Sequence, residues 1–506
     1  METFTRRAIL RRGPALALAT VSPLAVAARR ARTISPSGGD HDEIQIRNAF
    51  SQGVSDVVLN PGKYRISEPI VLGRNQTLRG INASLVATAS SNIELRTTAS
   101  CVVLSDDCIL EGLTFLAHEV TLAIPKGKQG TVIRVIGSNN IINNVKVSAS
   151  NDKDNPWPIA GAAVFGENLR NNKIIHSYFH MCGIFYCYGS ASFTEITGCT
   201  VTNAPGNAIS GYATSSKWRS EGHVVSNNKI NHPGRMGIEE FCHLDGKIKT
   251  FIFGTRILNN SIISSSNDSP IYFAMSMVGL DAYVSGNTIL NWPTSYCIEI
   301  GGGRGAVIEN NKILWDNGNP KCVIGIQIQK SDYVPKKTVI IRNNLFFSPG
   351  KAILSRGQDA NISYNIFKNV IISAVEYDVL GGRASIIGNT VMVNSPSIPA
   401  ISNRVIFSLT CFAKMYGNKI YYSKYSHREN LLETAVYSSN FPSLYSNNEI
   451  HIDYSDKSAR FIAFSGKAAD LIASKFEGNS VHFSKEGSVS KYSYRPNSGI
   501  SYILIK

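Results

Sequence analysis

A short turn signature recurs along almost the whole chain. Its core is a Gly or Asn, then usually an Asn, then any residue and a β-branched or apolar residue, as in Asn-Asn-Lys-Ile at 310–313. The second residue falls at positions 80, 112, 144, 172, 199, 228, 260, 287, 311, 344, 365, 389, 418, 448 and 479. Successive copies are 21 to 33 residues apart, a spacing typical of solenoids and other repeat arrays.

The residues within each repeat predict strands. Short runs rich in Ile, Val and Phe are broken by Gly, Asn, Ser and Pro, and none keeps a helical apolar spacing over a useful length. Asn tolerates the left-handed backbone of a sharp turn, and its amide can bond to its copy in the next coil. We therefore predict an all-β fold, a single-stranded right-handed parallel β-helix of about 15 coils.

The repeats between about residues 41 and 485 resemble those of the pectate-lyase-like β-helix superfamily. The opening is similar too: apolar residues at helical spacing in 42–54 predict a short N-terminal capping helix, and a Pro-Gly-x-Tyr turn follows at 61–64. That superfamily holds lyases, hydrolases, epimerases and phage tailspikes, so the resemblance implies a scaffold rather than an activity. The motifs of its individual enzyme families are absent, so no catalytic residue is carried over.

The start of the chain resembles an export signal. An arginine pair at 6–7 precedes an apolar run at 14–28, which contains the small residues Ala-Val-Ala at 25–27. This pattern resembles a bacterial twin-arginine signal peptide over residues 1–28, and a disordered basic tail is the alternative. We therefore expect a periplasmic or secreted protein.

The remaining boundaries follow from the repeats. We expect a linker at 29–41, the β-helix at 42–485 and a C-terminal tail or cap at 486–506, where the repeat is lost. That last segment is expected either to cover the last coil or to pair with another subunit, so a monomer and a homotrimer both remain open. No stretch is apolar and long enough to predict a membrane span.

The charge balance predicts an anionic partner. The formal net charge is +15, and residues 1–28 hold four Arg and one Glu, so the rest of the chain carries +12. For an exported β-helix, the expected partner is an acidic polysaccharide or oligosaccharide. No nucleic acid is expected, because no nucleic-acid motif is present and the Lys and Arg are scattered. The alternative is a charge that serves solubility alone.

The cysteines predict neither a disulfide framework nor a metal site. There are nine of them, and Cys182, Cys297 and Cys322 fall at matching places before strands. This arrangement favours a stack of buried thiols. No paired CxxC and no HExxH motif is present, so no metal and no cofactor are expected, apart from calcium if the protein is a lyase.

The chemistry is expected on one outward-facing column of side chains. Aligning the strands places one apolar position of each inward: Ile184, Ile209, Ile238, Ile271, Ile298, Ile326 and Ile353. Because side chains alternate along a strand, the following residue of each strand points outward. The outward column is then Phe185, Ser210, Glu239, Tyr272, Glu299, Gln327, Leu354 and Glu376.

Glu239 and Glu299 are the predicted catalytic pair. They lie two coils apart, so their Cβ atoms are expected roughly 10 Å apart. A carboxyl separation of about 6.5–9.5 Å suits an inverting glycosidase, in which one acid protonates the leaving oxygen and one base activates a water. Glu240 is the third catalytic candidate: either it is paired inside the coil, or a bulge turns it outward.

Aromatic and cationic side chains are predicted to flank the same groove. Aromatic rings stack on sugar faces, although each Trp has a structural role as its alternative. The long loops supply cations that either hold a uronate or sulfate or simply decorate the loops. The predicted substrate-binding residues are Tyr272, Trp218, Trp292, Trp157, Trp315, Arg235, Arg304, His243, Lys217, Arg219 and Gln327.

Three functions are compatible with these features. The first is a glycoside hydrolase that cleaves an extracellular, acidic polysaccharide with Glu239 and Glu299. The second is a polysaccharide lyase acting on a uronate polymer by β-elimination. In that case the proton-removing and charge-neutralising residues would come from Arg235, His243, Tyr272 and Lys217. The third is a non-catalytic polysaccharide-binding β-helix. The sequence favours the hydrolase.

Overall fold

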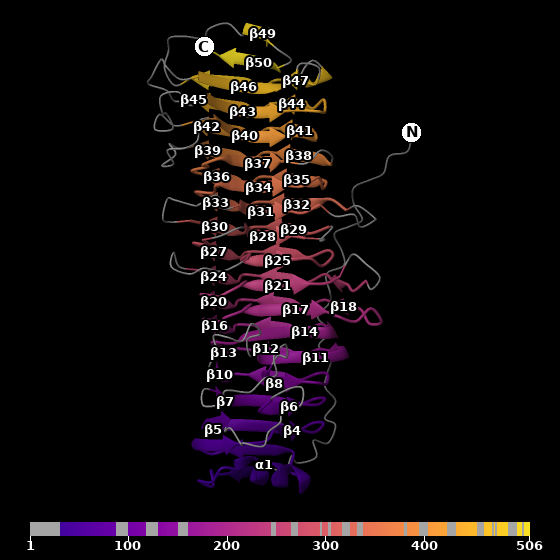
Figure 1. The fold of residues 1–506 in the computed structure, drawn as a ribbon, viewed down its shortest axis with the longest axis vertical. Helices are drawn as coiled ribbons and strands as arrows, with labels where there is room; N and C mark the ends of the chain where they lie inside the picture. The colour runs from indigo at the N-terminus through magenta and orange to yellow at the C-terminus, as the bar shows by residue number, and fades with distance from the viewer. Residues whose placement is uncertain are drawn as a thin grey trace, which may run out of the picture.

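The chain winds into an elongated stack of coils (Figure 1). The computed structural model describes residues 31–87, 100–117, 130–149, 160–243, 249–264, 272–293, 296–301, 305–315, 324–330, 337–378, 382–393, 403–422, 432–452, 460–467, 470, 473–483, 493–497 and 500–505. Almost every strand pairs in parallel with its copies in the coils below and above. The predicted parallel β-helix is therefore confirmed.

A complete coil contributes one strand to sheet B and two strands to sheet A. The strands of sheet B, one per coil, are β4 (Ile70–Leu72), β6 (Val102–Leu104), β8 (Thr131–Val135), β11 (Ala160–Arg170), β14 (Gly183–Ser192), β17 (Ile209–Ala213), β21 (Ile238–Phe241), β25 (Met275–Met277), β28 (Tyr296–Ile300), β31 (Ile324–Ile328), β34 (Lys351–Ser355), β37 (Ser373–Tyr377), β40 (Asn403–Leu409), β43 (Leu432–Ser438) and β46 (Arg460–Lys467). This series agrees with the predicted number of about 15 coils. Two short strands, β18 (Ser220–Glu221) and β22 (Ile252–Phe253), extend sheet B at its edge.

Sheet A contains the other two series. The first is β1 (Ala31–Ile34), β2 (Asp56–Leu59), β5 (Thr77–Ala87), β7 (Ile109–Ala117), β9 (Ile141–Asn143), β12 (Lys173–Ile175), β15 (Glu195–Thr197), β19 (Val224–Ser226), β23 (Arg256–Leu258), β26 (Tyr283–Ser285), β29 (Val307–Glu309), β32 (Val339–Arg342), β35 (Ala360–Ser363), β38 (Arg383–Ile387), β41 (Phe412–Tyr416), β44 (Leu444–Ser446) and β47 (Lys475–Glu477). The second is β3 (Gly62–Ile66), β10 (Lys146–Ala149), β13 (Tyr178–His180), β16 (Thr200–Thr202), β20 (Lys229–Asn231), β24 (Ser261–Ile263), β27 (Thr288–Leu290), β30 (Lys312–Leu314), β33 (Leu345–Phe347), β36 (Ile366–Lys368), β39 (Thr390–Val393), β42 (Lys419–Tyr422), β45 (Glu449–Ile452) and β48 (Ser480–Phe483).

An asparagine ladder joins the coils at the turn between the two strand series of sheet A. Each Asn side chain donates from Nδ2 to Oδ1 of the next, over 2.9 to 3.0 Å. The residue before it has a positive φ, for example 55° at Asn227 and 58° at Asn310, which Asn and Gly tolerate best. The ladder residues are Asn228, Asn260, Asn287, Asn311, Asn344, Asn365, Asn389, Asn418, Asn448 and Asn479.

The earlier copies of the signature do not all lie at this turn. Asn172 accepts from Nδ2 of Asn140, over 3.0 Å, at the turn that precedes β12, one strand earlier in the coil. Asn144 occupies the positive-φ position, with φ 51°, and Val145 takes the ladder position. The same dipeptide therefore serves two different turns, because both need one residue in the left-handed region.

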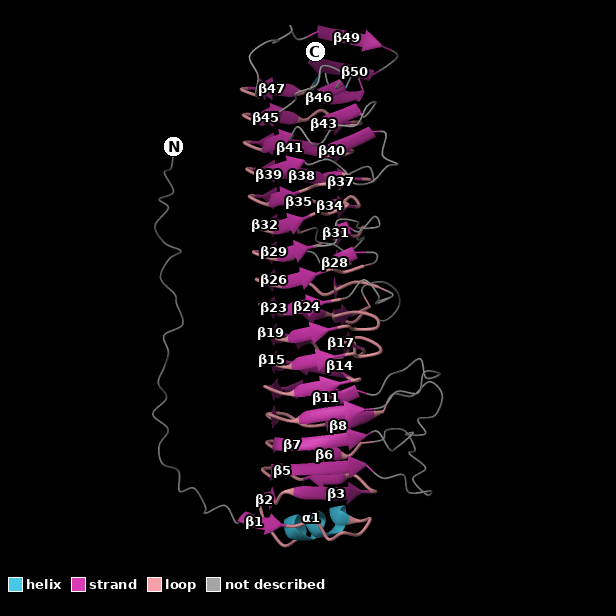
Figure 2. Ribbon diagram, turned by 90° about the vertical axis from the view of Figure 1, so that its left-hand side faces the viewer, coloured by secondary structure: helices cyan, strands magenta, loops and turns pink. Residues whose placement is uncertain are grey.

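The predicted capping helix covers the first coil. It is α1 (Asp42–Ser51), and it lies beneath the first strands (Figure 2). Ile46 and Phe50 bury their side chains against the coil. Arg47 donates to the carbonyl oxygen of Pro69 over 2.6 Å. The helix thereby closes the end of the core to water.

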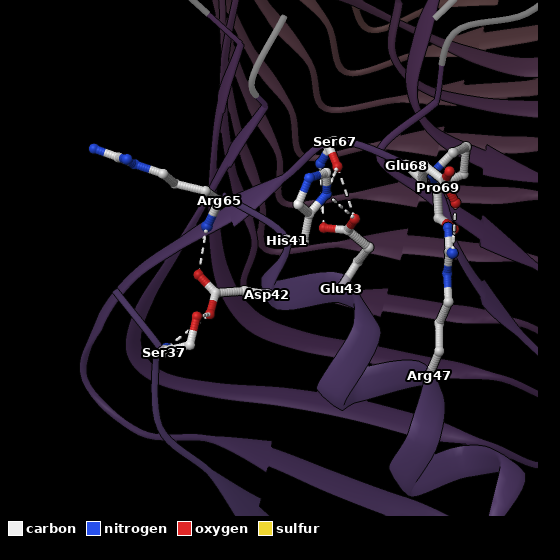
Figure 3. A network of polar contacts seen from close by, with 9 residues as sticks. All are labelled: Ser37, His41, Asp42, Glu43, Arg47, Arg65, Ser67, Glu68 and Pro69. Atoms are coloured by element: carbon white, nitrogen blue, oxygen red, sulfur yellow. Dashed lines mark hydrogen bonds and ion pairs between the residues drawn. The ribbon is translucent and has the colours of Figure 1, made fainter. Parts of the chain in front are cut away.

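Two buried carboxylates fix the start of that helix (Figure 3). Asp42 accepts hydrogen bonds from the backbone nitrogens of Ser37, over 2.7 Å, and Arg65, over 2.8 Å. Glu43 accepts from the hydroxyl of Ser67 over 2.7 Å. Carboxylates in the first turn also interact favourably with the positive end of the helix dipole.

Strands extend beyond the expected boundaries at both ends. The segment expected as a linker at 29–41 contains β1, which pairs with β2. Within 486–506, β49 (Ser493–Asn497) and β50 (Ile500–Ile505) pair with each other, and β50 pairs antiparallel with β46, so this segment covers the last coil. The predicted signal peptide at 1–28 lies outside the described residues. No helix in the described ranges is long and apolar enough to cross a membrane.

The interior of the coil is apolar and includes free thiols. Cys182 and Cys297 are buried and unpaired by disulfides, as expected, and Cys322 lies outside the described residues. Burial raises the pKa of the Cys182 thiol to about 12, so it stays protonated and unreactive near neutral pH.

Candidate functional site

The outer face of sheet B holds a column of polar side chains. The register pairs one residue from each of five successive strands, β17 to β31. The residue that precedes each of them points inward and is a fully buried apolar side chain, as alternation requires. We call this set the polar column, and its members are Ser210, Glu239, Ser276, Glu299 and Gln327.

The predicted place of Tyr272 in this column is wrong. Ser276 pairs with both Glu239 and Glu299, and Met275 fills the inward position. The strand begins at Met275, four residues after the Ile271 that the pattern placed inward. Tyr272 is exposed before that strand, and its ring lies under the guanidinium of Arg235, 4.8 Å from the carbon to the ring centre.

Glu239 lies within a dense set of donors. The Tyr212 hydroxyl and Nδ2 of Asn207 both donate to its Oε2. Nη2 of Arg235 lies 3.9 Å from its Oε1. Burial, reinforced by the charge of Glu239, raises the pKa of Tyr212, so this hydroxyl keeps its proton and stays a donor. Glu239 itself is 5% exposed.

Glu299 has neutral partners and is more open. The Ser276 hydroxyl donates to its Oε2 over 2.7 Å, and Nε2 of Gln329 donates to its Oε1 over 3.0 Å. Gln327, the next member of the polar column, is fully buried, and within the described residues neither atom of its amide has a hydrogen-bond partner. An unpaired buried amide costs free energy, which sets this end of the column apart from the hydrogen-bonded carboxylates.

Glu240 points inward, as strict alternation requires, and is 1% exposed. The Tyr186 hydroxyl donates to its Oε2 over 3.3 Å. Gly211, on the strand between them, leaves the space that the Tyr186 ring fills, since a Cβ there would lie 2.1 Å from that ring. Burial raises the pKa of Glu240 to about 7. Of the two alternatives for Glu240, the inward position is the one observed, and this residue cannot contact a ligand in the groove.

Two of the tryptophans predicted to flank the groove belong to the core. Trp292 is fully buried and Trp315 is 5% exposed. The indole nitrogen of Trp292 donates to the carbonyl oxygen of Tyr272, and that of Trp315 to the carbonyl oxygen of Trp292, each over 3.0 Å. The groove position expected for both is therefore wrong, because a satisfied indole N–H lets the ring enter the core.

Trp218 is the described tryptophan on the surface, at 36% exposed. Its indole nitrogen donates to Oε2 of Glu167 over 3.1 Å, and Nζ of Lys217 lies 4.9 Å from its ring centre. These contacts attach the loop of Trp218 to β11. Trp157 and Arg304 lie outside the described residues.

The other predicted cations are exposed near the ends of the same strands. Arg219 lies over the ring of Phe253 at 4.1 Å and forms an ion pair with Glu221 over 2.7 Å. The His243 ring meets the ring edge of Phe241 at 5.0 Å. In the described ranges, no three His, Cys, Asp or Glu side chains lie close enough together to hold a metal ion.

A second outward column was not predicted. Two residues beyond the polar column, the register aligns four half-buried aromatic rings from β11, β14, β17 and β21. We call it the aromatic column, and its members are Phe165, Tyr188, Tyr212 and Phe241. Alternation would have revealed Tyr212 and Phe241, because residues two apart on a strand share a face. It would have missed Tyr188, which lies three residues after Phe185 because β14 is irregular between Phe185 and Cys187.

The fold and the two columns define the chain as a parallel β-helix protein with a polar site on one sheet. No protein-family model and no curated protein sequence matches it. Similar solved structures include the Dettilon tailspike protein, with 12% identity, a TM-score of 0.46, and 67% of this chain and 66% of the tailspike covered.

Two enzymes are also similar in structure. The catalytic unit of a thermostable α-1,3-glucanase from Streptomyces thermodiastaticus has 16% identity and a TM-score of 0.39, with 76% of this chain and 68% of that chain covered. A mannuronic acid specific polysaccharide family 6 lyase from human gut microbiota has 12% identity and a TM-score of 0.41, with 84% and 87% covered. At these values the likeness carries no conclusion about the activity of this chain.

Proposed function

We propose that the protein is a glycoside hydrolase that cleaves an acidic polysaccharide between Glu239 and Glu299. The observation that supports this proposal is the register of the polar column, which places both carboxylates on one outer face, two strands apart. Two strand spacings of about 4.8 Å put their Cβ atoms roughly 10 Å apart. Long side chains shorten that gap toward the range of about 6.5–9.5 Å that leaves room for a water in inverting glycosidases.

The different surroundings of the two carboxylates support different roles. Arg235, Tyr212 and Asn207 surround Glu239 with donors and positive charge, which suits a carboxylate acting as a base. Glu299 has only the neutral donors Ser276 and Gln329 among its described contacts, which suits a group that must carry and release a proton.

The proposed reaction has two proton transfers. Glu299 gives its proton to the glycosidic oxygen as the bond from that oxygen to the anomeric carbon breaks. Glu239 takes a proton from the water whose oxygen bonds to the same carbon. The products are a new reducing end and a new hydroxyl on the leaving sugar, and each Glu returns to its first state by exchanging a proton with solvent.

The cations around the site support an acidic substrate. Arg235 and Lys217 each lie over an aromatic ring, near the two columns. Outside the signal-like residues 1–28, the chain carries a net charge of +12, which attracts polyanions at low salt. Because the N-terminal sequence resembles an export signal, we propose that the protein binds this polysaccharide outside the cytoplasm.

A lyase is the second candidate, and the pair of Arg235 and Tyr272 favours it. Tyr272 is exposed and Arg235 is half-buried beside it, so that the tyrosine could remove a proton next to a uronate carboxylate that the arginine neutralises. Tyr212 is unsuited to that role, because burial raises its pKa.

Product analysis by mass spectrometry tests the proposal. The full chain is incubated with acidic and neutral polysaccharides in ordinary water and in water enriched in heavy oxygen. Hydrolysis predicts products that carry the heavy oxygen. Unlabelled products that are one water lighter would establish the lyase, and binding without products from any polysaccharide would reduce the site to a recognition surface.

A further inference from the structure

The aromatic column continues the surface of the proposed active site toward the N-terminal end of the molecule. Its rings make contact in order: the centres are 4.9 Å apart for Phe165 and Tyr188, 6.2 Å for Tyr188 and Tyr212, and 6.0 Å for Tyr212 and Phe241. The Tyr212 hydroxyl also donates to Glu239. The column and the catalytic pair are therefore one connected surface.

The geometry of the rings leaves aromatic surface open. Phe165 and Tyr188 are stacked at 10°, but the Tyr188–Tyr212 pair is tilted by 52° and the Tyr212–Phe241 pair by 48°. Tilted rings do not cover one another's faces, and all four rings are half-buried rather than buried. The column spans three strand spacings, about 14 Å, which is longer than one sugar ring.

Unpaired polar atoms lie beside the rings. Asn207 and Ser210 are more than nine-tenths buried, and in the described part of the chain Oδ1 of Asn207 and Oγ of Ser210 have no hydrogen-bond partner. Nδ2 of Asn207 donates to the Tyr212 hydroxyl over 3.0 Å. Buried polar groups without partners cost free energy that a ligand hydroxyl would recover.

Cationic groups lie at the far end of the column. The Arg134 guanidinium lies over the ring of Phe165 at 4.4 Å. Lys217 lies over Trp218, whose indole binds Glu167, two residues after Phe165 on the same strand. An ammonium group on an open ring is a favourable partner for a sugar carboxylate that stacks nearby.

We propose that the aromatic column is a saccharide-binding strip that holds the part of an acidic glycan chain on the N-terminal side of Glu239, with Lys217 contacting a carboxylate at its far end. The strip rests on the proposed function for its placement, because the scissile bond is taken to lie between Glu239 and Glu299. The sugar faces pack on Tyr188, Tyr212 and Phe241, and the glycan runs along the long axis of the β-helix. The enzyme would then prefer chains of several sugar units.

The test compares binding of short and long acidic oligosaccharides. Calorimetry on the Glu299→Gln variant uses oligogalacturonates and oligomannuronates from disaccharide to octasaccharide, with cello-oligosaccharides as the neutral series. We expect Tyr188→Ala to weaken binding of an acidic octasaccharide about tenfold and to leave the disaccharide unchanged. Lys217→Gln should weaken binding of the acidic series more than that of the neutral one.

Tyr178→Ala is the matched control. Tyr178 is an exposed tyrosine of the same coil, but it lies on sheet A, where its ring stacks on His180. The Tyr178→Ala variant should bind all the oligosaccharides with the affinity of the parent protein. If Tyr188→Ala fails to fold, Lys217→Gln keeps the proposal open to refutation, because Lys217 is a surface side chain.

The outcomes separate the strip from the proposed function. Unchanged affinity in both variants, or a parent protein that binds octasaccharides no more tightly than disaccharides, would overturn the strip even if hydrolysis is observed. Length-dependent binding that Tyr188→Ala weakens, without any turnover by the unmodified protein, would support the strip and overturn the hydrolase. Loss of kcat without a change in KM for long chains in Tyr188→Ala would also contradict a role in binding.

Discussion

Glu239 and Glu299 are both register partners of Ser276, one on the strand before it and one on the strand after. The residue between the two carboxylates is therefore small, and its hydroxyl donates to Glu299 over 2.7 Å. A large side chain at this position would fill the space where the proposed reaction places the glycosidic bond. The arrangement follows from strand alternation and parallel stacking alone.

Tyr212 is expected to act as a positioning residue for Glu239. The Tyr212→Phe variant loses the donor to Oε2 of Glu239 but keeps the ring. We expect kcat to fall about tenfold and KM for a disaccharide to change little, because an oriented carboxylate matters most in the transition state. Tyr178→Phe, which loses a hydroxyl bonded to Thr202 on sheet A, is the control. An unchanged kcat in Tyr212→Phe would refute this role.

The tryptophans should divide into core and surface residues. Trp292→Ala removes a fully buried ring, and we expect it to lower the free energy of unfolding by about 3–5 kcal/mol. Trp218→Ala removes an exposed ring and should change that free energy by less than about 0.5 kcal/mol. Urea denaturation followed by circular dichroism measures both. Equal stability losses would contradict the positions described for these two rings.

Glu240 should make the stability of the protein depend on pH. Its pKa is raised from 4.5 to about 7 by burial, so the folded protein binds its proton more tightly than the unfolded chain does. The contribution of Glu240 to the free energy of unfolding is therefore greatest below about pH 4.5. It falls by about 3 kcal/mol in total as the pH rises to about 7. Glu240→Gln should be more stable than the parent protein at pH 8 by a similar amount.

The measurement is the urea midpoint of both proteins at several pH values between 4 and 8. Glu376→Gln serves as the control, because Glu376 is a half-buried carboxylate of sheet B that pairs with Lys351 over 2.7 Å. The Glu376→Gln variant should lose stability between pH 4.5 and 7 as the parent protein does. Parallel profiles for Glu240→Gln and the parent protein would show that Glu240 does not titrate as its burial implies.

The asparagine ladder should contribute strongly to stability. In Asn311→Ala, the nitrogens of Asn287 lose their acceptor, and the carbonyl of Val284 and Oδ1 of Asn344 lose a donor. We expect a loss of about 3 kcal/mol, because buried polar groups are left unpaired. Asn310→Gly, at the neighbouring exposed position with φ 58°, should be nearly neutral. A ladder variant as stable as this control would mean that the coils do not depend on the side-chain bonds.

The fold could be predicted from the sequence because its signals are local. Asn260 and its copies mark a turn that needs a left-handed residue and a stacked amide, and both requirements hold within a few residues. The sequence could not tell which of two turns Asn172 occupies, since both turns have the same requirement. Only the pairing of whole coils decides that.

The candidate site was predictable only where alternation was unbroken. Glu239 and Glu299 each follow a buried Ile, and the register puts both in the outward column in which the sequence placed them; their catalytic role stays a prediction. Tyr272 was misplaced because Ile271 and Met275 are both apolar residues that precede a candidate outward side chain, and the length of the loop before the strand is not encoded locally. Trp292 was misplaced because its partner, a backbone carbonyl, leaves no trace in the sequence.

The most direct test of the account is the turnover of Glu239→Gln, Glu299→Gln and Glu376→Gln on a polysaccharide that the parent protein cleaves. We expect each of the first two to lower kcat by a factor of about a thousand or more, and Glu376→Gln, farther along the same face, to keep it. Binding of the oligosaccharide should persist in all three. Full turnover in either Glu239→Gln or Glu299→Gln would contradict the central claim that these two carboxylates form the active site.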